Sequence, residues 1–373
     1  MSRIAIVSDA IFPYNNGGKE TRIYELSTRL AASGHDVHIY TMHWWSDAGS
    51  HRVENGVHLH AISPLYPLHA GERRSIRQGI LFGLACFKLI TAKFDVIDVD
   101  HMPYFPLFSV RIVTWLKRKP MYATWHEVWG RAYWKTYLGR LGIIGYVMEK
   151  LTVLLPNQII AVSDMTAARL RKEMGVSNNL LTVYNGIDLN SIAKVRAAST
   201  KSDVLYAGRL LKHKNVDVLL RAVARLKRTR FDISCVIVGD GPQRLNLEKL
   251  AVKLGIEANV RFVGFLPENS QVYAYMKASS VFVLPSTREG FGISVIEANA
   301  CGLPVVTIDA PANAARYLIS TSNGRLAKLT PASIATQIEV LLTSPVSVRS
   351  VKSTVKSYDW RTSATNLSLV YAS

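Results

Sequence analysis

Residues 284–306 read LPSTREGFGISVIEANACGLPVV, the most informative stretch of the chain. A short apolar run ends at Pro285, and the loop after it carries Glu289. A helical pattern that contains Glu297 then leads into a second apolar run. Strand, glycine-bearing loop, helix and strand in that order are typical of a βαβ unit in a parallel sheet.

The loop and the start of the helix have the features of a binding site for an anionic ligand. Two glycines allow the backbone to approach a ligand closely. The first N–H groups of a helix have no acceptor within the helix and favour a phosphate. We therefore expect substrate binding by Gly290, Phe291, Gly292, Ile293 and Ser294.

The same alternation of strands and helices extends outward over the whole chain. In the first half, strands are expected at 4–7, 36–41, 57–62, 96–99, 121–125 and 159–162, with helices at 19–33, 76–91 and 106–115. In the second half, strands are expected at 204–207, 233–238, 260–262, 281–284 and 305–308, with helices at 216–227 and 294–300.

The pattern predicts an α/β protein with two Rossmann-like, doubly wound parallel sheets that face each other across a cleft. We expect residues 1–185 to form an N-terminal, acceptor-side domain, joined by a C-terminal helix at 356–373. Residues 186–355 are expected to form the domain that binds a nucleotide-bearing ligand. A length of 373 residues suits two such cores.

Charge and composition narrow the classes of function. The chain has 45 Lys and Arg against 27 Asp and Glu, for a net charge of +18, which favours anionic partners such as nucleic acids, phosphorylated molecules or an anionic membrane. No nucleic-acid-binding motif occurs, so no nucleic acid is expected as a partner. The first strand is not followed by the GxGxxG pattern of a dinucleotide oxidoreductase.

Cysteine usage and apolar runs indicate a cytoplasmic protein without a membrane span. Cys86, Cys235 and Cys301 lie far apart in apolar stretches, so we expect reduced, buried thiols. The first residues are interpreted as a buried strand instead of a secretory leader. The apolar stretch 79–91 is shorter than the roughly 20 residues that a spanning helix needs.

The spacing Glu289-x7-Glu297, followed by ACGLPVV, resembles the signature of family-4 retaining glycosyltransferases of the GT-B fold. The resemblance implies that Glu289 contacts the hydroxyls of the donor sugar and that Glu297 contacts the ribose. The segment 206–214 resembles the family's G-R…K loop, where Arg209 and Lys214 would neutralise the donor diphosphate. Cations placed there would stabilise the negative charge that develops on the leaving oxygen.

Further positions match the same family. Gly17 and Gly18, between the first strand and helix, resemble its phosphate-approaching glycine loop. His126, at a strand end, would stabilise charge at the anomeric carbon through its backbone carbonyl and orient the sugar through its ring. The strand-end segments that would hold the nucleotide contain Gly239, Gly264, Phe265 and Leu266.

The resemblance implies a hexosyltransferase-type enzyme that transfers a sugar, with retention, from a UDP- or GDP-linked donor. No cofactor is expected beyond this nucleotide-sugar co-substrate. No metal is expected either, although the sequence Asp98-Val99-Asp100 fits the D-x-D pattern literally. In a GT-B protein Arg and Lys hold the diphosphate instead.

Basic and aromatic residues in the first half of the chain indicate the class of acceptor. Lys88 lies within the apolar stretch 79–91 and Lys93 just after it, and aromatic residues expected to be exposed occur beside basic ones at Trp115 and in the run from Trp129 to Lys135. Such surfaces suit an anionic membrane. We expect a lipid-linked acceptor and a peripheral position on the inner face of the cell membrane. A soluble acceptor and a nucleic-acid-binding α/β protein are the alternatives.

Overall fold

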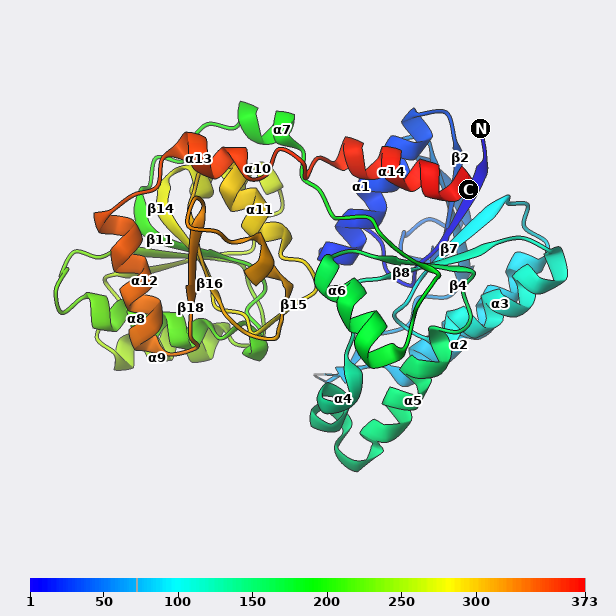
Figure 1. Cartoon of the computed structure of the whole chain (residues 1–373), viewed down its shortest axis with the longest axis horizontal. Coiled ribbons are helices and arrows are strands. Elements are labelled where there is room, and N and C mark those ends of the chain that lie inside the picture. The colour runs from blue at the N-terminus through cyan, green and yellow to red at the C-terminus, as the bar shows by residue number, and fades with distance from the viewer. Residues whose placement is uncertain (72, 373) are drawn as a thin grey trace. The chain divides into compact units, whose positions relative to one another are not determined.

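The computed structural model describes residues 1–71 and 73–372, which form two compact units (Figure 1). Unit 1 contains residues 1–185 and the C-terminal segment that begins at Trp360, and unit 2 contains Gly186–Asp359. The helix predicted at 356–373 is shorter, because Tyr358 and Asp359 are extended and pair with Ile187. Helix α14 therefore spans Trp360–Ala372, and Ser373 lies outside the described residues.

The sheet of unit 1 has, in the described part of the chain, eight strands in the order β10-β9-β8-β7-β1-β2-β4-β3. All neighbouring pairs are parallel except β3 and β4. The strands are β1 (Arg3–Val7), β2 (Asp36–Met42), β3 (His51–Glu54), β4 (Val57–Ser63), β7 (Val96–Asp100), β8 (Met121–Trp125), β9 (Gln158–Ala161) and β10 (Leu180–Thr182). A separate short hairpin pairs β5 (His69–Ala70) with β6 (Arg73–Arg74).

Two cores cover the two faces of this sheet, because side chains alternate along a strand. Ile4 and Ile6 of β1 belong to the core under α1 and α14, which lie side by side in Figure 1. Ala5 and Val7 belong to the core under α2 and α3. The helices are α1 (Gly18–Ala32), α2 (Ile76–Ala85), 3-10 helix η1 (Cys86–Ile90), α3 (Phe105–Lys117), α4 (Gly130–Leu138), 3-10 helix η2 (Gly139–Leu141), α5 (Gly142–Thr152), α6 (Asp164–Arg169) and π-helix η3 (Leu170–Met174).

The main sheet of unit 2 is parallel and has, among the described residues, six strands in the order β13-β12-β11-β14-β16-β18. The strands are β11 (Ser202–Ala207), β12 (Cys235–Val238), β13 (Val260–Gly264), β14 (Ser279–Leu284), β16 (Val305–Ile308) and β18 (Gly324–Ala327), and β15 (Arg288–Glu289) pairs separately with β17 (Ala312–Asn313). The helices are α7 (Leu189–Lys194), η4 (Lys212–Lys214), α8 (Val216–Leu226), α9 (Arg244–Lys253), α10 (Asn269–Lys277), α11 (Ile293–Ala300), η5 (Ala314–Leu318), α12 (Pro331–Thr343) and α13 (Val348–Ser353).

The structure corrects two expectations about the first half. The helix predicted at 76–91 changes at Cys86 from α2 into the 3-10 helix η1. The prediction of exposed aromatic residues holds for Trp115, which is 71% exposed, but is wrong for Trp129 and Trp134, which are buried. Both indoles are held in the core because the backbone N–H of Trp129 and the ring N–H of Trp134 donate to the buried carboxylate of Glu149.

Among the described residues, no helix combines the length and the apolar character that crossing a bilayer requires. All three cysteines are buried with free thiols, as the sequence predicted.

Candidate functional site

The loops that follow β11, β12 and β13 meet at the carboxyl edge of the sheet in unit 2. The N–H of Gly208 donates to the carbonyl of Val238, and the N–H of Gly239 donates to that of Gly264. Gly239 has φ +124°, and a Cβ there would lie 2.1 Å from the carbonyl oxygen of Gly208. Glycine is therefore required at 239 for this contact between loops, whatever ligand the loops hold.

The loop after β11 carries the two predicted cations. Arg209 follows the strand-end Gly208 and is exposed. Its backbone carbonyl accepts a hydrogen bond from the buried Tyr206 hydroxyl at 3.0 Å, which fixes the loop at this residue. Lys214 ends the short helix η4, and the side chain of Asn215 ties this segment to the carbonyl of Pro285 at 3.1 Å.

The structure brings Lys214 together with Glu289, which is 75 residues away in sequence. The ammonium Nζ lies 2.6 Å from Oε1 of the carboxylate, and both side chains are largely buried. Burial alone would raise the pKa of Glu289, but Lys214, together with Ser286 and His213, outweighs burial and leaves that pKa below its ordinary value. Glu289 is therefore ionised at neutral pH and can accept hydrogen bonds from hydroxyl groups.

Helix α11 begins four residues after this carboxylate. Gly292 precedes it with φ +101°, and a Cβ there would lie 2.6 Å from the Cβ of Ala315, so the turn needs glycine. The first helical residues are Ile293 and Ser294, whose N–H groups have no acceptor within the helix. The ring of Phe291 is buried and packs edge-on against Tyr358, so its side chain supports the loop.

The second predicted carboxylate, Glu297, lies on α11 and is positioned from α10. The hydroxyl of Tyr273 donates to its Oε1 at 3.0 Å. At the end of β13, Gly264 has φ +90°, Phe265 is exposed, and Leu266 is half-buried. A planar group could stack on the exposed Phe265 ring.

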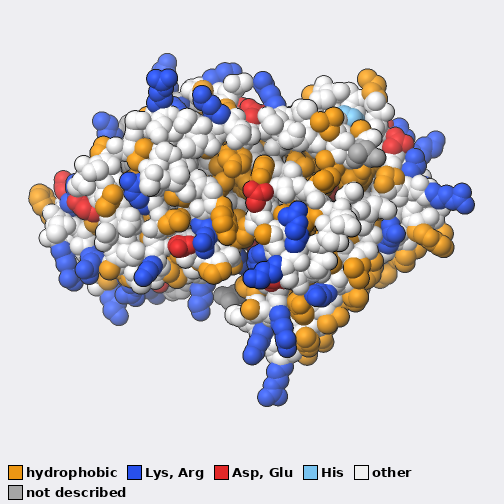
Figure 2. Space-filling view, in the orientation of Figure 1, with side chains coloured by type: hydrophobic (Ala, Val, Ile, Leu, Met, Phe, Trp, Pro, Cys, Tyr) orange, Lys and Arg blue, Asp and Glu red, His pale blue; other side chains and the backbone are white. Residues whose placement is uncertain are grey.

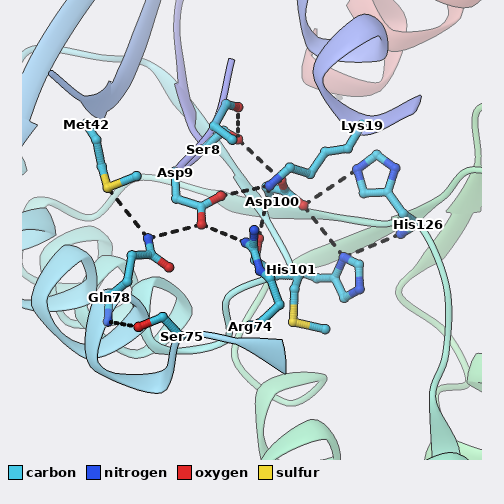
Figure 3. Close-up of polar contacts among 12 residues, drawn as sticks. Ser8, Asp9, Lys19, Met42, Arg74, Ser75, Gln78, Asp100, His101 and His126 are labelled. Carbon is cyan, nitrogen blue, oxygen red and sulfur yellow. Dashed lines mark hydrogen bonds and ion pairs between the residues drawn. The ribbon is translucent and has the colours of Figure 1, made fainter. Parts of the chain in front are cut away.

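Unit 1 has its own cluster of polar groups at the carboxyl edge of its sheet (Figure 3). The Lys19 ammonium lies 2.8 Å from Oδ1 of Asp9 and 2.7 Å from Oδ2 of Asp100. Arg74 also contacts Asp9, at 2.7 Å. Both carboxylates are buried, and the net effect of Lys19 and the neighbouring histidines is to hold the pKa of Asp100 well below its ordinary range, against the effect of burial.

His126 lies at the rim of this cluster. Its ring Nε2 is 3.6 Å from Oδ1 of Asp100, and its backbone N–H donates to the ring of His101. Its backbone carbonyl accepts from the Thr166 hydroxyl at 3.3 Å, which orients the oxygen assigned to the anomeric carbon. Burial lowers the pKa of the His126 ring to about 3, although Asp100 acts to raise it.

The ring of His126 is expected to stay neutral throughout the physiological range. A histidine in an unfolded chain has a pKa near 6.5. Between about pH 6.5 and 3, the ring of His126 is therefore protonated in the unfolded state but not in the folded state. The stability contributed by neutral His126 is full above this window and is lost as the pH falls through it. Titration followed by ¹⁵N NMR, with His126→Gln identifying the resonance, checks this; a midpoint near 6.5 would contradict it.

The sequence interpretation selected Gly17, Gly18 and His126 but missed Asp9, Lys19, Arg74 and Asp100 as site groups. Gly17 precedes α1, and Gly18 is its first residue. Asp9 and Asp100 each stand at or just after the carboxyl end of a strand, and the strand-end rule could have found them. The contact of Arg74 with Asp9 depends on the tertiary fold and has no local signal.

The Asp98-Val99-Asp100 sequence is explained by protein partners. Asp98 accepts hydrogen bonds from Thr124 and from Tyr371 of α14, and Asp100 pairs with Lys19. Burial raises the pKa of Asp98 to about 6, against the effect of those two hydrogen bonds. Among residues 1–71 and 73–372, no group of three or more acidic, histidine or cysteine side chains is arranged to hold a metal ion.

Two α/β units with paired charges and a helix N-terminus at the carboxyl edges of their sheets are typical of proteins that bind phosphorylated ligands. Comparison with known families specifies the class. Residues 16–191 match the model of "Glycosyltransferase Family 4", and residues 189–357 match that of "Glycosyl transferases group 1". Together the two matches indicate that the chain is a glycosyltransferase of the GT-B fold and the family 4 type.

Individual relatives agree with this assignment. The chain is 27% identical over 333 residues to an uncharacterized glycosyltransferase of Methanocaldococcus jannaschii, covering 82% of this chain and 80% of that protein. It is 30% identical over 178 residues to a GDP-mannose-dependent alpha-(1-6)-phosphatidylinositol dimannoside mannosyltransferase of Mycobacterium tuberculosis, covering 45% of each. The structure of Anabaena HepE in complex with UDP and glucose has the same fold, with a TM-score of 0.75, 18% identity and full coverage of both chains.

Proposed function

We propose that the protein transfers a sugar, with retention at the anomeric carbon, from a nucleotide-diphosphate-sugar to a hydroxyl of a lipid-linked or other membrane-associated acceptor. The observation that carries the proposal is the Lys214–Glu289 pair, held at 2.6 Å, with Glu289 four residues before the start of α11. A cation, an ionised carboxylate and the first N–H groups of a helix match the three parts of such a donor near its reactive bond.

In unit 2, each group has a separate task in the proposed reaction. Arg209 and Lys214 neutralise the diphosphate, with the first N–H groups of α11 beside them. The ionised Glu289 accepts hydrogen bonds from the sugar hydroxyls. Glu297, oriented by Tyr273, accepts from the ribose hydroxyls. The cations fill the role that a metal ion has in other sugar transferases, and the proposal includes no cofactor.

The bond changes balance without an enzyme nucleophile. The bond between the anomeric carbon and the phosphate oxygen breaks, and its electron pair stays on the phosphate. The acceptor oxygen bonds to the anomeric carbon on the same face, and the acceptor proton passes to the departing phosphate. The carbonyl of His126 would stabilise the positive charge at the carbon, and the neutral ring would orient the sugar.

The names of similar proteins support the finer parts of this proposal. HepE was solved with UDP and glucose, and the mycobacterial relative is named for GDP-mannose and a phosphatidylinositol lipid. A UDP- or GDP-linked donor and a lipid-linked acceptor therefore fit this chain best. The proposed location is the cytoplasm, on the inner face of the cell membrane.

The experiment is calorimetry of the full chain against a panel of UDP-, GDP- and ADP-sugars, followed by NMR of the transferred sugar. We expect one nucleotide class to bind and the product to keep the donor's anomeric configuration. Binding of none of the panel would overturn the donor assignment, and an inverted product would overturn the mechanism. Salt-sensitive retention on DNA without nucleotide-sugar binding would favour a nucleic-acid-binding protein instead.

A further inference from the structure

Helix α5 of unit 1 has its polar and apolar sides reversed relative to an ordinary surface helix. Its buried residues are Gly142, Gly145, Glu149 and Thr152. The glycines let α5 approach α4 closely, because a Cβ at Gly145 would lie 2.2 Å from the ring of Trp134. The solvent-facing side is mostly apolar and contains Ile143, Ile144, Val147 and Leu151 beside the exposed Lys150, with Leu141 and Leu154 just beyond the two ends.

Two neighbouring segments expose apolar side chains in the same way. Along α2 and η1, the buried stripe includes Phe82, Cys86 and Leu89. A second stripe, at steps of three or four residues, is exposed and contains Ile76, Ile80, Leu84, Phe87 and Ile90. On α3, which packs against α2, the exposed apolar residues are Ile112, Trp115 and Leu116.

These stripes form one surface, here named the apolar platform: the exposed apolar residues of α2, η1, α3, η2 and α5 together with Leu154. Arg111 of α3 donates to Asn157, three residues after Leu154, which joins α3 to the segment that follows α5. Figure 2 shows the hydrophobic side chains as a continuous band along the margin where Figure 1 places α3, α2 and α5. Large contiguous apolar patches on the surface of a soluble protein mark sites of interaction with a partner or a membrane.

The charges around the platform are almost all positive. Between residues 76 and 154, a range that the structure describes completely, Asp95 is the one acidic residue classed as exposed, and it pairs with Lys119. Asp98, Asp100 and Glu149 are buried, and Glu127 accepts from Trp129. The exposed basic residues in this range are Arg77, Lys88, Lys93, Arg118, Arg131, Lys135, Arg140 and Lys150.

We infer that the apolar platform docks unit 1 on an anionic phospholipid bilayer, with its apolar side chains among the acyl chains and its basic rim at the headgroups. Apolar helices flanked by Lys and Arg bind at such an interface, and each nearby cation adds about 1 kcal/mol of attraction. A second copy of the chain is a poor occupant, because two cationic rims would repel each other. The binding of this surface to a bilayer does not depend on the proposed function. Only the further statement that the bilayer presents the acceptor rests on the proposed function.

Vesicle flotation of the full chain tests this inference. We expect stronger binding to phosphatidylcholine vesicles that contain phosphatidylglycerol than to phosphatidylcholine alone, with part of the difference lost at high salt. The triple variant Ile143→Ser, Ile144→Ser, Leu151→Ser should partition at least about tenfold more weakly, because three apolar side chains no longer enter the bilayer. The charge variant Arg140→Glu, Lys150→Glu should lose the preference for anionic vesicles.

The matched control removes three apolar side chains of unit 2 that are even more exposed, in Phe231→Ser, Leu245→Ser, Val252→Ser. It should bind vesicles like the wild type. Equal partitioning of the wild type and the α5 triple variant would overturn the inference. It would also be overturned if the wild type bound no vesicles but self-associated, and the triple variant abolished that self-association. Nucleotide-sugar affinity, measured on the same samples, should be unchanged in the triple variant. Vesicle binding without nucleotide-sugar binding would support the membrane-docking inference and contradict the proposed function.

Discussion

Replacing Lys214 with alanine is expected to lower kcat for sugar transfer by about 10²–10³-fold, the loss typical when one donor to a developing oxyanion is removed. The ammonium is fixed by Glu289 at 2.6 Å and is largely buried, so its charge is little screened by water. Affinity for the nucleoside diphosphate should fall as well. Steady-state kinetics and calorimetry with the nucleotide chosen by the panel measure both effects.

Lys212→Ala is the matched control for this change. Lys212 belongs to the same short helix η4 but is exposed, so its loss should change kcat by less than about twofold. If Lys212→Ala and Lys214→Ala lose equal activity, the loop acts only through its overall charge. That result would contradict a specific role for Lys214.

Replacing Glu289 with glutamine is expected to lower kcat/KM for the sugar donor by about 10²-fold while leaving affinity for the free nucleoside diphosphate almost unchanged. The carboxylate is assigned to the sugar, so a ligand without the sugar should not detect the change. Glutamine has the same shape but carries no charge. The comparison of the two ligands by calorimetry, beside donor kinetics, separates this role from a general loss of the site.

The double variant Lys214→Ala, Glu289→Gln distinguishes catalysis from stability. Each single variant leaves one largely buried partner without its ion pair, and the double variant removes both charges. We expect the melting temperature to recover in part while activity stays at the level of the poorer single variant. Recovery of activity together with stability would show that the pair is structural. Glu257→Gln, at an exposed glutamate, controls for the loss of one negative charge.

Most strands of both sheets could be predicted because they are short apolar runs followed by loops and amphipathic helices. Buried strands read as continuous apolar segments, as in β8 and β12. Strand β3 was missed because it lies at the sheet edge and its residues alternate between exposed and half-buried. Helix α5 was missed because its apolar residues face the solvent. Its sequence therefore lacks the apolar stripe by which a core-facing helix is predicted.

The residues of the candidate site divide in a similar way. Glu289 and Glu297 could be found because a loop and a helix next to each other in sequence carry them. The contact between Lys214 and Glu289 depends on the parallel pairing of β11 with β14, which brings distant loops to one edge. The burial of Trp129 and Trp134 could not be predicted, since it depends on Glu149 from another helix.

The most direct test is a crystal structure of the full chain with the nucleoside diphosphate that the panel selects. The account predicts the diphosphate within hydrogen-bond distance of Arg209 and Lys214, with a phosphate oxygen at the first N–H groups of α11. The ribose should lie against Glu297. A nucleotide bound elsewhere in the chain, with Lys214 still paired only to Glu289, would contradict it.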